Sequence, residues 1–554
     1  MIRIRRLLAL RRLLFWGAAA ACLAASPAAH AQNAPTVNAP AGRVQGASAG
    51  SVNAFKGIPY AAPPVGPARW KPPIPAPHWE GVRKAAQFGP ACMQPNPRSI
   101  SIYADPLAST SEDCLSLNVW APKGAHDLPV MVWIHGGALT SGASSETIYD
   151  GARLAAQGIV VVSINYRMGV LGYLAHPALG AESPAGLSGN YGLLDQIEAL
   201  RWVRRNVGAF GGDPSKVTIA GESAGGLSVM YLMASPPARG LFSGAIAESA
   251  YMITTPALKR SVFGMPSAED EGVKLAAKLH ASDIAALRAM DPQALTNAAA
   301  ASGFAPFGAV DGKFLPGQLV DVFDKGEQAR VPILAGSNSG EIRSLTFLLP
   351  PAPASASEYE RIIRERYRDL ADSFLKLYPS TDIRESMLAT TRDAMYAWTA
   401  ERLAKAQAAI GAPSYLYLFD HGYPAADSKG LHGFHASELP FVFGTRDLLP
   451  PYWPKPPETA EETRLSDAMV GYWSSFVKTG RPEATGEPQW PRFGATDAYM
   501  AFEAGPQPKT HLPQEAYALH EAVVCRRRAD GTLAWNWNIG VIAPPTPDKS
   551  PACP

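Results

Sequence analysis

The chain has 554 residues, of which 47% are hydrophobic and 18% are charged, and its formal net charge at pH 7 is +2. The hydrophobic share suffices for a large buried core, and the charged share lies below the average of about 25% for soluble proteins. Because the charge is nearly balanced and forms no basic stripe in the mature sequence, we expect no nucleic-acid partner.

Residues 1–31 are predicted to be an export signal. Arginines between positions 3 and 12 precede an apolar stretch from Leu13 to Ala25, and Ala29-His30-Ala31 matches a signal cleavage site. The apolar stretch is shorter than the about 20 residues that a membrane-spanning helix requires, so we expect removal of the signal and no membrane anchor. The mature chain is expected to begin near Gln32 and to be secreted or periplasmic, and the signal does not distinguish these two locations.

The cysteines of the mature chain agree with export. They lie at positions 92, 114, 525 and 553, an even number that favours disulfides in an oxidising compartment. Pairing by proximity along the chain joins Cys92 to Cys114 and Cys525 to Cys553, although other pairings are possible on this reasoning alone.

Short, continuous apolar segments predict buried β-strands along the chain. They occupy residues 128–134, 158–164, 217–220, 331–335 and 415–419. Apolar residues with helical spacing predict a helix over 191–206, and charged, helical stretches at 256–300 and 358–409 are interpreted as insertions that cover the sheet. Buried strands that alternate with helices are typical of a large, mostly parallel central sheet flanked by helices, so the predicted fold class is α/β.

In sheets of this kind, functional residues gather where the strands end. The strand at 128–134 is followed by His135-Gly136-Gly137, where glycine lets main-chain amides approach a substrate oxygen closely. Such amides stabilise an oxyanion, and loss of one donor typically costs about 10²–10³ in turnover. We expect Gly136, Gly137 and Ala224 to form an oxyanion hole; the alternative is a glycine turn beside a core histidine.

The strand at 217–220 leads into Gly221-Glu222-Ser223-Ala224-Gly225 and then into a helix-like stretch at 227–233. A serine between small residues at a strand-to-helix turn is held in a strained, exposed conformation that suits a nucleophile. The following helix directs its N-terminal amides toward developing negative charge. We therefore predict Ser223 as a catalytic nucleophile, although the Gly-x-Ser-x-Gly string alone also occurs in ordinary turns.

A serine nucleophile needs a base beside it and an acid that orients the base. Candidate histidines after the serine include His280, His421, His432, His435, His511 and His520. His435 lies on a loop before an apolar segment, and Glu341 follows the strand at 331–335, which gives the order serine, acid, histidine. From spacing alone, Glu341 is equally consistent with a surface carboxylate.

A metal site is the alternative use of this histidine loop. His432 and His435 are three residues apart, as a pair of metal ligands can be. No carboxylate or thiolate ligand set surrounds them in the sequence, so we predict neither a metal site nor a cofactor.

Several motifs together resemble those of the type-B carboxylesterase/lipase family along nearly the whole mature chain. Residues 210–225 look like the serine signature of that family in full, and residues 112–120 are similar to its second signature. Residues 55–61, 166–169 and 189–196 also match. The resemblance implies one catalytic domain of the α/β-hydrolase fold over residues 32–554.

The resemblance also implies roles for individual residues. The triad is Ser223, Glu341 and His435, and the oxyanion amides are those of Gly136, Gly137 and Ala224. Glu222 and Ser249 are expected to support the triad from beside it. The resemblance further implies a Cys92–Cys114 disulfide and an ion pair between Arg69 and Glu112.

Two departures from the family pattern bear on the site. Gly340 and Ile342 flank Glu341, where the family usually has an acidic residue or asparagine before the glutamate and a glycine after it. Between Cys92 and Cys114 the chain has no tryptophan, the residue with which cholinesterases bind quaternary ammonium, but it has Tyr103. The second departure argues against a specialist for choline esters.

We therefore expect hydrolysis of small-molecule carboxylic esters through an acyl-enzyme. The same triad serves lactones, amides and acyl transfer to an alcohol, so these reactions remain as alternatives. A binding protein without catalysis is a further alternative, against which the intact Ser223, Glu341 and His435 argue. The sequence fixes neither the natural ester nor the oligomeric state.

Overall fold

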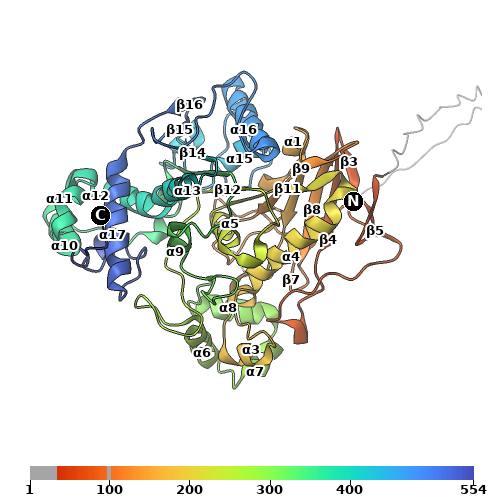
Figure 1. Cartoon of the computed structure of the whole chain (residues 1–554), viewed down its shortest axis with the longest axis horizontal. Coiled ribbons are helices and arrows are strands. Elements are labelled where there is room, and N and C mark those ends of the chain that lie inside the picture. Colours follow the sequence, from red (N-terminus) through yellow and green to blue (C-terminus); the bar gives the residue numbers. More distant parts are fainter. Residues whose placement is uncertain (1–33, 97–100, 554) are drawn as a thin grey trace, which may run out of the picture. The chain divides into compact units, whose positions relative to one another are not determined.

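The computed structural model describes residues 34–96 and 101–553 (Figure 1), so the predicted export signal at 1–31 lies outside the described residues. From Pro35 onward the chain forms one compact unit. In the described ranges, none of the helices combines the length and the apolar character that crossing a bilayer requires.

The central sheet has 11 strands in the described part of the chain. Its order is β16-β15-β14-β13-β12-β11-β9-β10-β8-β4-β3. The strands are β3 (Ala47–Ala49), β4 (Val52–Pro59), β8 (Ser116–Pro122), β9 (Leu128–Ile134), β10 (Val160–Ile164), β11 (Gly212–Glu222), β12 (Gly244–Glu248), β13 (Ile333–Asn338), β14 (Ser414–Phe419), β15 (Tyr499–Phe502) and β16 (Pro506–Lys509).

The pairs from β10 through β9 and β11 to β15 are parallel, whereas the strands toward β3 and the β15–β16 pair are antiparallel. The predicted α/β fold with a large, mostly parallel sheet is therefore confirmed. A separate small sheet contains β1 (Thr36–Ala39), β2 (Gly42–Gln45) and β5 (Val82–Lys84), and β6 (Ala91–Cys92) pairs with β7 (Thr110–Ser111).

Strand β9 illustrates why the central strands are continuous runs of apolar residues. Successive side chains of a strand point to opposite faces. Val130, Val132 and Ile134 accordingly join the hydrophobic core on one face, whereas Met131 and Trp133 join the core on the other. Because both faces are covered, neither set of side chains reaches solvent, and the strand reads as one continuous hydrophobic run.

Helices cover both faces of the sheet (Figure 1). They are α1 (Ala152–Ala155), α2 (Gly169–Tyr173), α3 (Pro177–Glu182), α4 (Tyr191–Asn206), α5 (Ala224–Ala234), α6 (Ala268–Lys278), α7 (Ile284–Ala289), α8 (Pro292–Ala301), α9 (Leu319–Asp324), α10 (Ala356–Tyr367), α11 (Ala371–Leu377), α12 (Ile383–Arg392), α13 (Trp398–Ala409), α14 (Pro424–Asp427), α15 (Leu439–Val442), α16 (Ala460–Thr479) and α17 (Gln514–Asp530). Helices α4 and α5 pack into the core on one face, and α16 packs into the core on the other.

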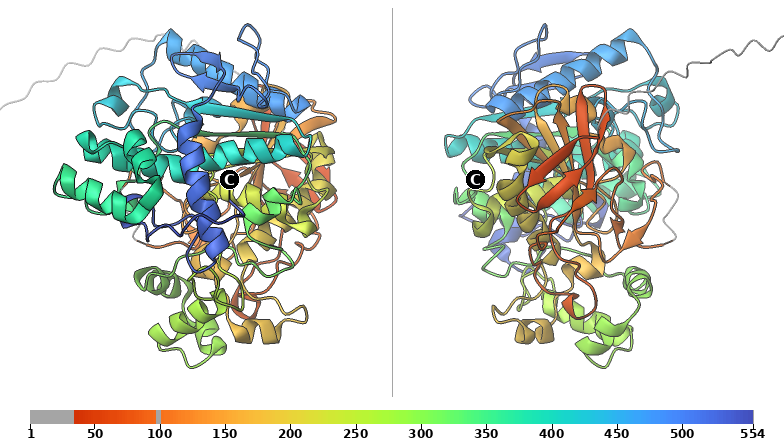
Figure 2. Two further views of the ribbon diagram at one scale, coloured as in Figure 1. Left: turned by 60° about the vertical axis from the view of Figure 1, so that its left-hand side comes forward. Right: turned by 90° about the vertical axis from the view of Figure 1, so that its right-hand side faces the viewer.

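The charged stretches predicted as helical insertions form two separate groups. Helices α6 to α8 lie at one end of the unit and α10 to α12 at another, as the views in Figure 1 and Figure 2 agree. Each helix of the first group begins at a side-chain cap: Ser267, Asp283 and Asp291 accept a hydrogen bond from the amide three residues further on. Helix α13 instead runs against β13 and β14.

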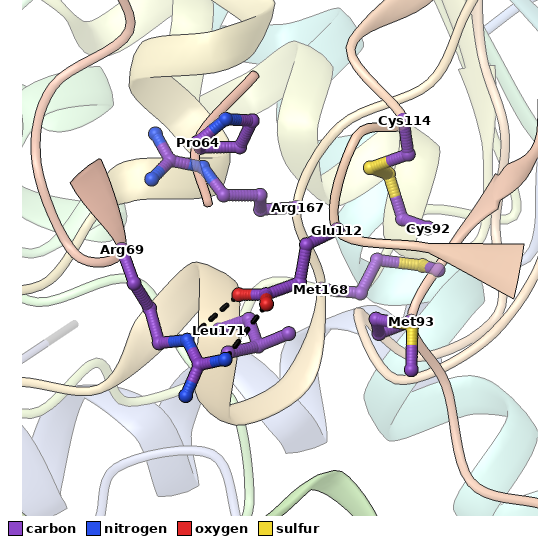
Figure 3. Close-up of a pocket in the computed structure, with 9 residues that line it drawn as sticks. All are labelled: Pro64, Arg69, Cys92, Met93, Glu112, Cys114, Arg167, Met168 and Leu171. Carbon is purple, nitrogen blue, oxygen red and sulfur yellow. Dashed lines mark hydrogen bonds and ion pairs between the residues drawn. A yellow bond between two sulfur atoms is a disulfide. The ribbon is translucent and has the colours of Figure 1, made fainter. Parts of the chain in front are cut away.

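Disulfides join Cys92 to Cys114 and Cys525 to Cys553. The second bond ties the C-terminal tail to α17. The first lies beside the ion pair of Arg69 with Glu112 (Figure 3), in which both guanidinium contacts to the carboxylate measure 2.7 Å. Arg69 Nη1 also donates to the carbonyls of Arg288, in the last turn of α7, and of Met290, just past its C-terminus. The buried guanidinium thus fastens the first insertion to the disulfide loop.

Replacing Arg69 with methionine is expected to lower the free energy of unfolding by about 3–5 kcal/mol, because the nearly buried Glu112 carboxylate loses its partner. Arg69→Lys keeps the charge but not the planar fork, so we expect an intermediate loss. Urea unfolding of the three proteins measures the difference. A methionine variant within about 0.5 kcal/mol of the wild type would show that the pair contributes nothing to stability.

Candidate active site

Ser223 occupies the turn between β11 and α5. Its backbone has φ 56° and ψ −120°, in the left-handed region that residues other than glycine rarely adopt. Its amide donates to the carbonyl of Glu248 at the end of the neighbouring strand β12, at 2.9 Å. This bond and the start of α5 hold the turn, so the serine is partly exposed in the strained conformation that a nucleophile at this position requires.

Steric constraints require glycine at positions 221 and 225 of the turn. A Cβ atom at Gly225 would lie 2.0 Å from the carbonyl oxygen of Ile134, and one at Gly221 would lie 2.6 Å from the backbone of Gly225. The turn therefore folds against the end of β9, which is also where the predicted oxyanion segment begins. A Cβ atom at Gly136 would lie 3.2 Å from Ser223 Cβ, so this segment borders the serine directly.

The three amides predicted for the oxyanion hole differ in their surroundings. Burial raises the pKa of Tyr149, which lies near the Gly136 backbone. The amides of Gly137 and Ala224 make no hydrogen bond to another described residue. Gly137 has φ 98°, and the next residue, Ala138, has φ 54°.

Glu341 and His435 are in direct contact. Glu341 Oε2 lies 2.5 Å from His435 Nδ1, and Glu341 Oε1 accepts a hydrogen bond from the Asn338 amide at 2.8 Å. Glu341 follows β13 directly and is completely buried. The Gly340 amide donates to the carbonyl of Gly433 at 2.7 Å, which fastens the loop of the acid to the loop of the histidine.

The other nitrogen of His435 faces the serine turn. Nε2 lies 3.1 Å from Oε1 of Glu222, the residue before Ser223. Within the described residues, Ser223 Oγ makes no hydrogen bond to this ring. The structure therefore joins Glu341 to His435 but has no hydrogen bond from Ser223 Oγ to His435 Nε2, a contact that is often long in enzymes without substrate.

Glu222 belongs to a group of buried carboxyl groups behind the serine. Burial raises its pKa well above the usual value, and the charges of Glu341 and Glu248 raise it further. Burial likewise raises the pKa of Glu438, whose carboxyl accepts a hydrogen bond from Asn338 Nδ2. The raised pKa favours the neutral form of the carboxyl group that faces His435 Nε2.

Glu248 allows a test of the raised pKa values of these buried carboxyl groups. Burial raises its pKa from 4.5 to about 8, against a hydrogen bond from Trp473 Nε1 at 2.9 Å. Between these pH values the folded state keeps a proton that the unfolded chain has lost, so stability falls as pH rises through this window. Ser249, the next residue, is buried with its hydroxyl unpaired within the described residues.

We therefore expect Glu248→Gln to become more stable relative to the wild type as pH rises. Glutamine keeps an oxygen for Trp473 Nε1 but has no proton to lose. Since one pKa unit corresponds to about 1.4 kcal/mol, the difference in free energy of unfolding should change by about 3 kcal/mol between about pH 5 and pH 8. Urea unfolding across this range measures it, and parallel pH curves for the two proteins would contradict it.

Aromatic side chains that the sequence patterns did not single out surround His435. Tyr396 lies on a π-helical segment, Asp393–Ala397, and its ring centroid is 5.1 Å from that of His435. Such segments are rare and frequently occur at functional sites. Tyr251, two residues after Ser249, packs edge-on against Tyr396. Aromatic residues at β-strand ends and in helices are usually core residues, so no sequence signal distinguished these.

The second histidine of the loop lies apart from this arrangement. His432 contacts Asp420 and Asp427, each at 3.1 Å. In the ranges that the structure describes, no three His, Cys, Asp or Glu side chains are grouped as metal ligands. A strained serine turn after a central strand, with a Glu–His pair on later loops of the same sheet, is the arrangement typical of an α/β-hydrolase.

Comparison with known proteins agrees with this class. The model of the carboxylesterase family matches residues 33–520. The fumonisin B1 esterase of Sphingopyxis macrogoltabida is 38% identical over 478 residues, which cover 83% of this chain and 85% of that protein. The para-nitrobenzyl esterase of Bacillus subtilis is 39% identical over 470 residues, which cover 82% of this chain and 91% of that protein.

A solved structure of a PNB esterase aligns with a TM-score of 0.77 and 35% identity, and covers 87% of this chain and 99% of that one. The chain therefore belongs to the carboxylesterase family and is an enzyme that hydrolyses carboxylic esters.

Proposed function

We propose that the chain hydrolyses small-molecule esters through a covalent acyl-enzyme, with Ser223 as nucleophile, His435 as general base and Glu341 as the acid that orients the histidine. The observation that supports this best is the 2.5 Å contact between Glu341 Oε2 and His435 Nδ1, on a ring whose Nε2 faces the serine turn. A carboxylate at Nδ1 favours the tautomer in which Nε2 can accept a proton, which supports the role of base.

The reaction then proceeds in two halves. Ser223 Oγ attacks the ester carbonyl while His435 Nε2 takes the hydroxyl proton, and the imidazolium is stabilised by Glu341. Collapse of the tetrahedral intermediate breaks the bond to the alcohol, which leaves with the proton from His435. Water attacks the acyl-serine while His435 takes one of its protons. Collapse of the second tetrahedral intermediate breaks the bond to Ser223 Oγ, which receives this proton from His435, and the acid is released.

The negative charge of each tetrahedral intermediate requires donors beside Ser223. The amides of Gly137 and Ala224 have no other acceptor among the described residues, and glycine at 137 lets the backbone pass close to the substrate. We propose these two as donors. Gly136, which precedes Gly137 in the same turn, and Ala138, which follows it, offer further amides.

We further propose that residues 1–31 direct export and that the mature enzyme acts outside the cytoplasm. The arginine-rich start, the short apolar stretch and the Ala29-His30-Ala31 site support export. The disulfides Cys92–Cys114 and Cys525–Cys553 fit an oxidising compartment. Mass spectrometry of the protein purified from a secreting host tests this, and an intact Met1 would contradict it.

The relatives are named for different esters, among them fumonisin B1, para-nitrobenzyl esters and cocaine. This range supports a small-molecule ester as the substrate class of this chain without selecting one acyl or alcohol group. A matched aryl ester and anilide with the same acyl group separate ester hydrolysis from amide hydrolysis. We expect turnover of the ester and little turnover of the anilide, and comparable rates for both would contradict the proposed class.

A rapid acid quench during ester turnover tests the mechanism separately. We expect a peptide that contains Ser223 to carry the acyl group, because the covalent intermediate forms on every turnover. Ester turnover without an acylated peptide at any quench time would favour direct attack by water.

A further inference from the structure

The hydroxyl of Tyr103 connects the loop of the acid to the loop of the histidine. It lies 3.0 Å from the carbonyl oxygen of His435 and 2.6 Å from Ser344 Oγ. Ser344 ends the short 3-10 helix that Glu341 begins. Since a carbonyl only accepts, the Tyr103 hydroxyl donates to His435 and can accept from Ser344, so both of its contacts are satisfied at once.

The ring of Tyr103 is fixed as well. It packs edge-on against His435, with centroids 6.4 Å apart, and edge-on against Trp453 at 5.8 Å. Such edge-to-face pairs are among the preferred arrangements of aromatic rings. The phenol is therefore held between the imidazole itself and the segment that follows the histidine loop.

The segment that carries Tyr103 is anchored by contacts other than those to the Glu341 and His435 loops. Tyr103 lies within the loop closed by the Cys92–Cys114 disulfide. Two residues further on, the buried Asp105 accepts a hydrogen bond from the Thr147 amide at 2.6 Å. Tyr103 thus brings an independently anchored segment into contact with both loops that hold the Glu341–His435 pair.

We propose that Tyr103 is a positioning residue of the catalytic site, whose hydroxyl holds the backbone of His435 and the segment after Glu341 in the relation that proton transfer requires. This inference rests on the function proposed above. The hydroxyl remains a donor over the working pH range, since burial raises the pKa of Tyr103 well above its usual value. A shift of the imidazole by a fraction of an ångström is sufficient to slow proton transfer to and from Nε2.

The variant Tyr103→Phe keeps the ring contacts and removes only the hydroxyl. We expect kcat for an aryl ester to fall about tenfold, with KM within about twofold of the wild type, because the lost bond orients the base and does not bind substrate. The matched control is Tyr359→Phe on α10, whose buried hydroxyl also donates to a carbonyl, that of Tyr378 at 3.0 Å. We expect this control to keep the wild-type kcat.

Tyr103→Phe loses two hydrogen bonds and Tyr359→Phe loses one, so both melting temperatures should fall, that of Tyr103→Phe by at least as much. A purely structural role for Tyr103 would then give the two variants the same kcat per folded molecule, and this result would overturn the proposal. A change confined to KM would also overturn it, because it would assign Tyr103 to substrate binding.

A double-mutant cycle with Ser344→Ala tests the connection, or bridge, that the Tyr103 hydroxyl makes between Ser344 and the His435 carbonyl. We expect Ser344→Ala alone to lower kcat about threefold, and the double variant to match Tyr103→Phe alone, because both changes break the same connection. Independent effects, whose product appears in the double variant, would contradict a bridge. A fluorophosphonate, which reacts with a serine that a neighbouring histidine activates, separates the two proposals. If it labels Ser223 but Tyr103→Phe is fully active, only the positioning role fails.

Discussion

Replacing Ser223 with alanine is expected to lower kcat for an aryl ester by about 10⁵–10⁶-fold without loss of the folded state. The serine makes no side-chain hydrogen bond within the described residues that the fold would lose. Its strained backbone is held by the Glu248 carbonyl and by the close packing of Gly225 on Ile134. Steady-state kinetics and a melting curve measure both expectations.

The matched control lies at the other end of the same helix. Ser235 follows α5, is completely buried, and has an unpaired hydroxyl within the described residues. Ser235→Ala should keep the wild-type kcat. Residual activity of Ser223→Ala above about 1% of the wild type, from protein free of wild-type contamination, would assign the nucleophile to another residue.

Replacing Glu341 with glutamine is expected to lower kcat by about 10³–10⁴-fold. The two carboxylate oxygens of Glu341 accept from His435 Nδ1 and from the Asn338 amide. Glutamine has one oxygen, so its NH₂ group must face one of these two donors. Either the histidine takes the wrong tautomer or the buried Asn338 amide loses its acceptor.

The variant Glu341→Asp tests the charge of the side chain separately from its length. It keeps the negative charge but shortens the side chain, so we expect a smaller loss of kcat than for Glu341→Gln. The pH profile of kcat/KM for each variant gives the comparison. A glutamine variant within about tenfold of the wild type would show that Glu341 is not the residue that orients His435.

The framework of the fold could be predicted from the sequence because its signals are local. The apolar segments 128–134 and 415–419 correspond to β9 and β14, and the helical spacing over 191–206 corresponds to α4. Strands β8 and β12 escaped prediction. Asn118 interrupts the apolar run of β8, and β12 has only four apolar residues, mostly small, before it ends at Glu248. Their neighbours in the sheet bury these side chains, which a local pattern cannot indicate.

In the candidate site, too, local sequence patterns indicate some residues, whereas others are brought together only by the fold. Ser223 is predictable because strand, turn and helix follow one another along the chain. Glu341 could be assigned from spacing only as one of two equal alternatives, and the family resemblance favoured it. The supporting residues Tyr103, Glu248 and Tyr396 lie far from one another in sequence and carry no motif. Only their placement around His435 and Ser223 distinguishes them from ordinary core residues.

The most direct test of Ser223 as the nucleophile is to identify the residue that a fluorophosphonate modifies. This reagent reacts with a serine that a neighbouring histidine activates. We expect one adduct per active chain, located by peptide mass spectrometry on Ser223, with loss of ester hydrolysis in proportion to labelling and no adduct in Ser223→Ala. An inactivated enzyme with its adduct on another residue, or full activity after complete labelling of Ser223, would contradict Ser223 as the nucleophile.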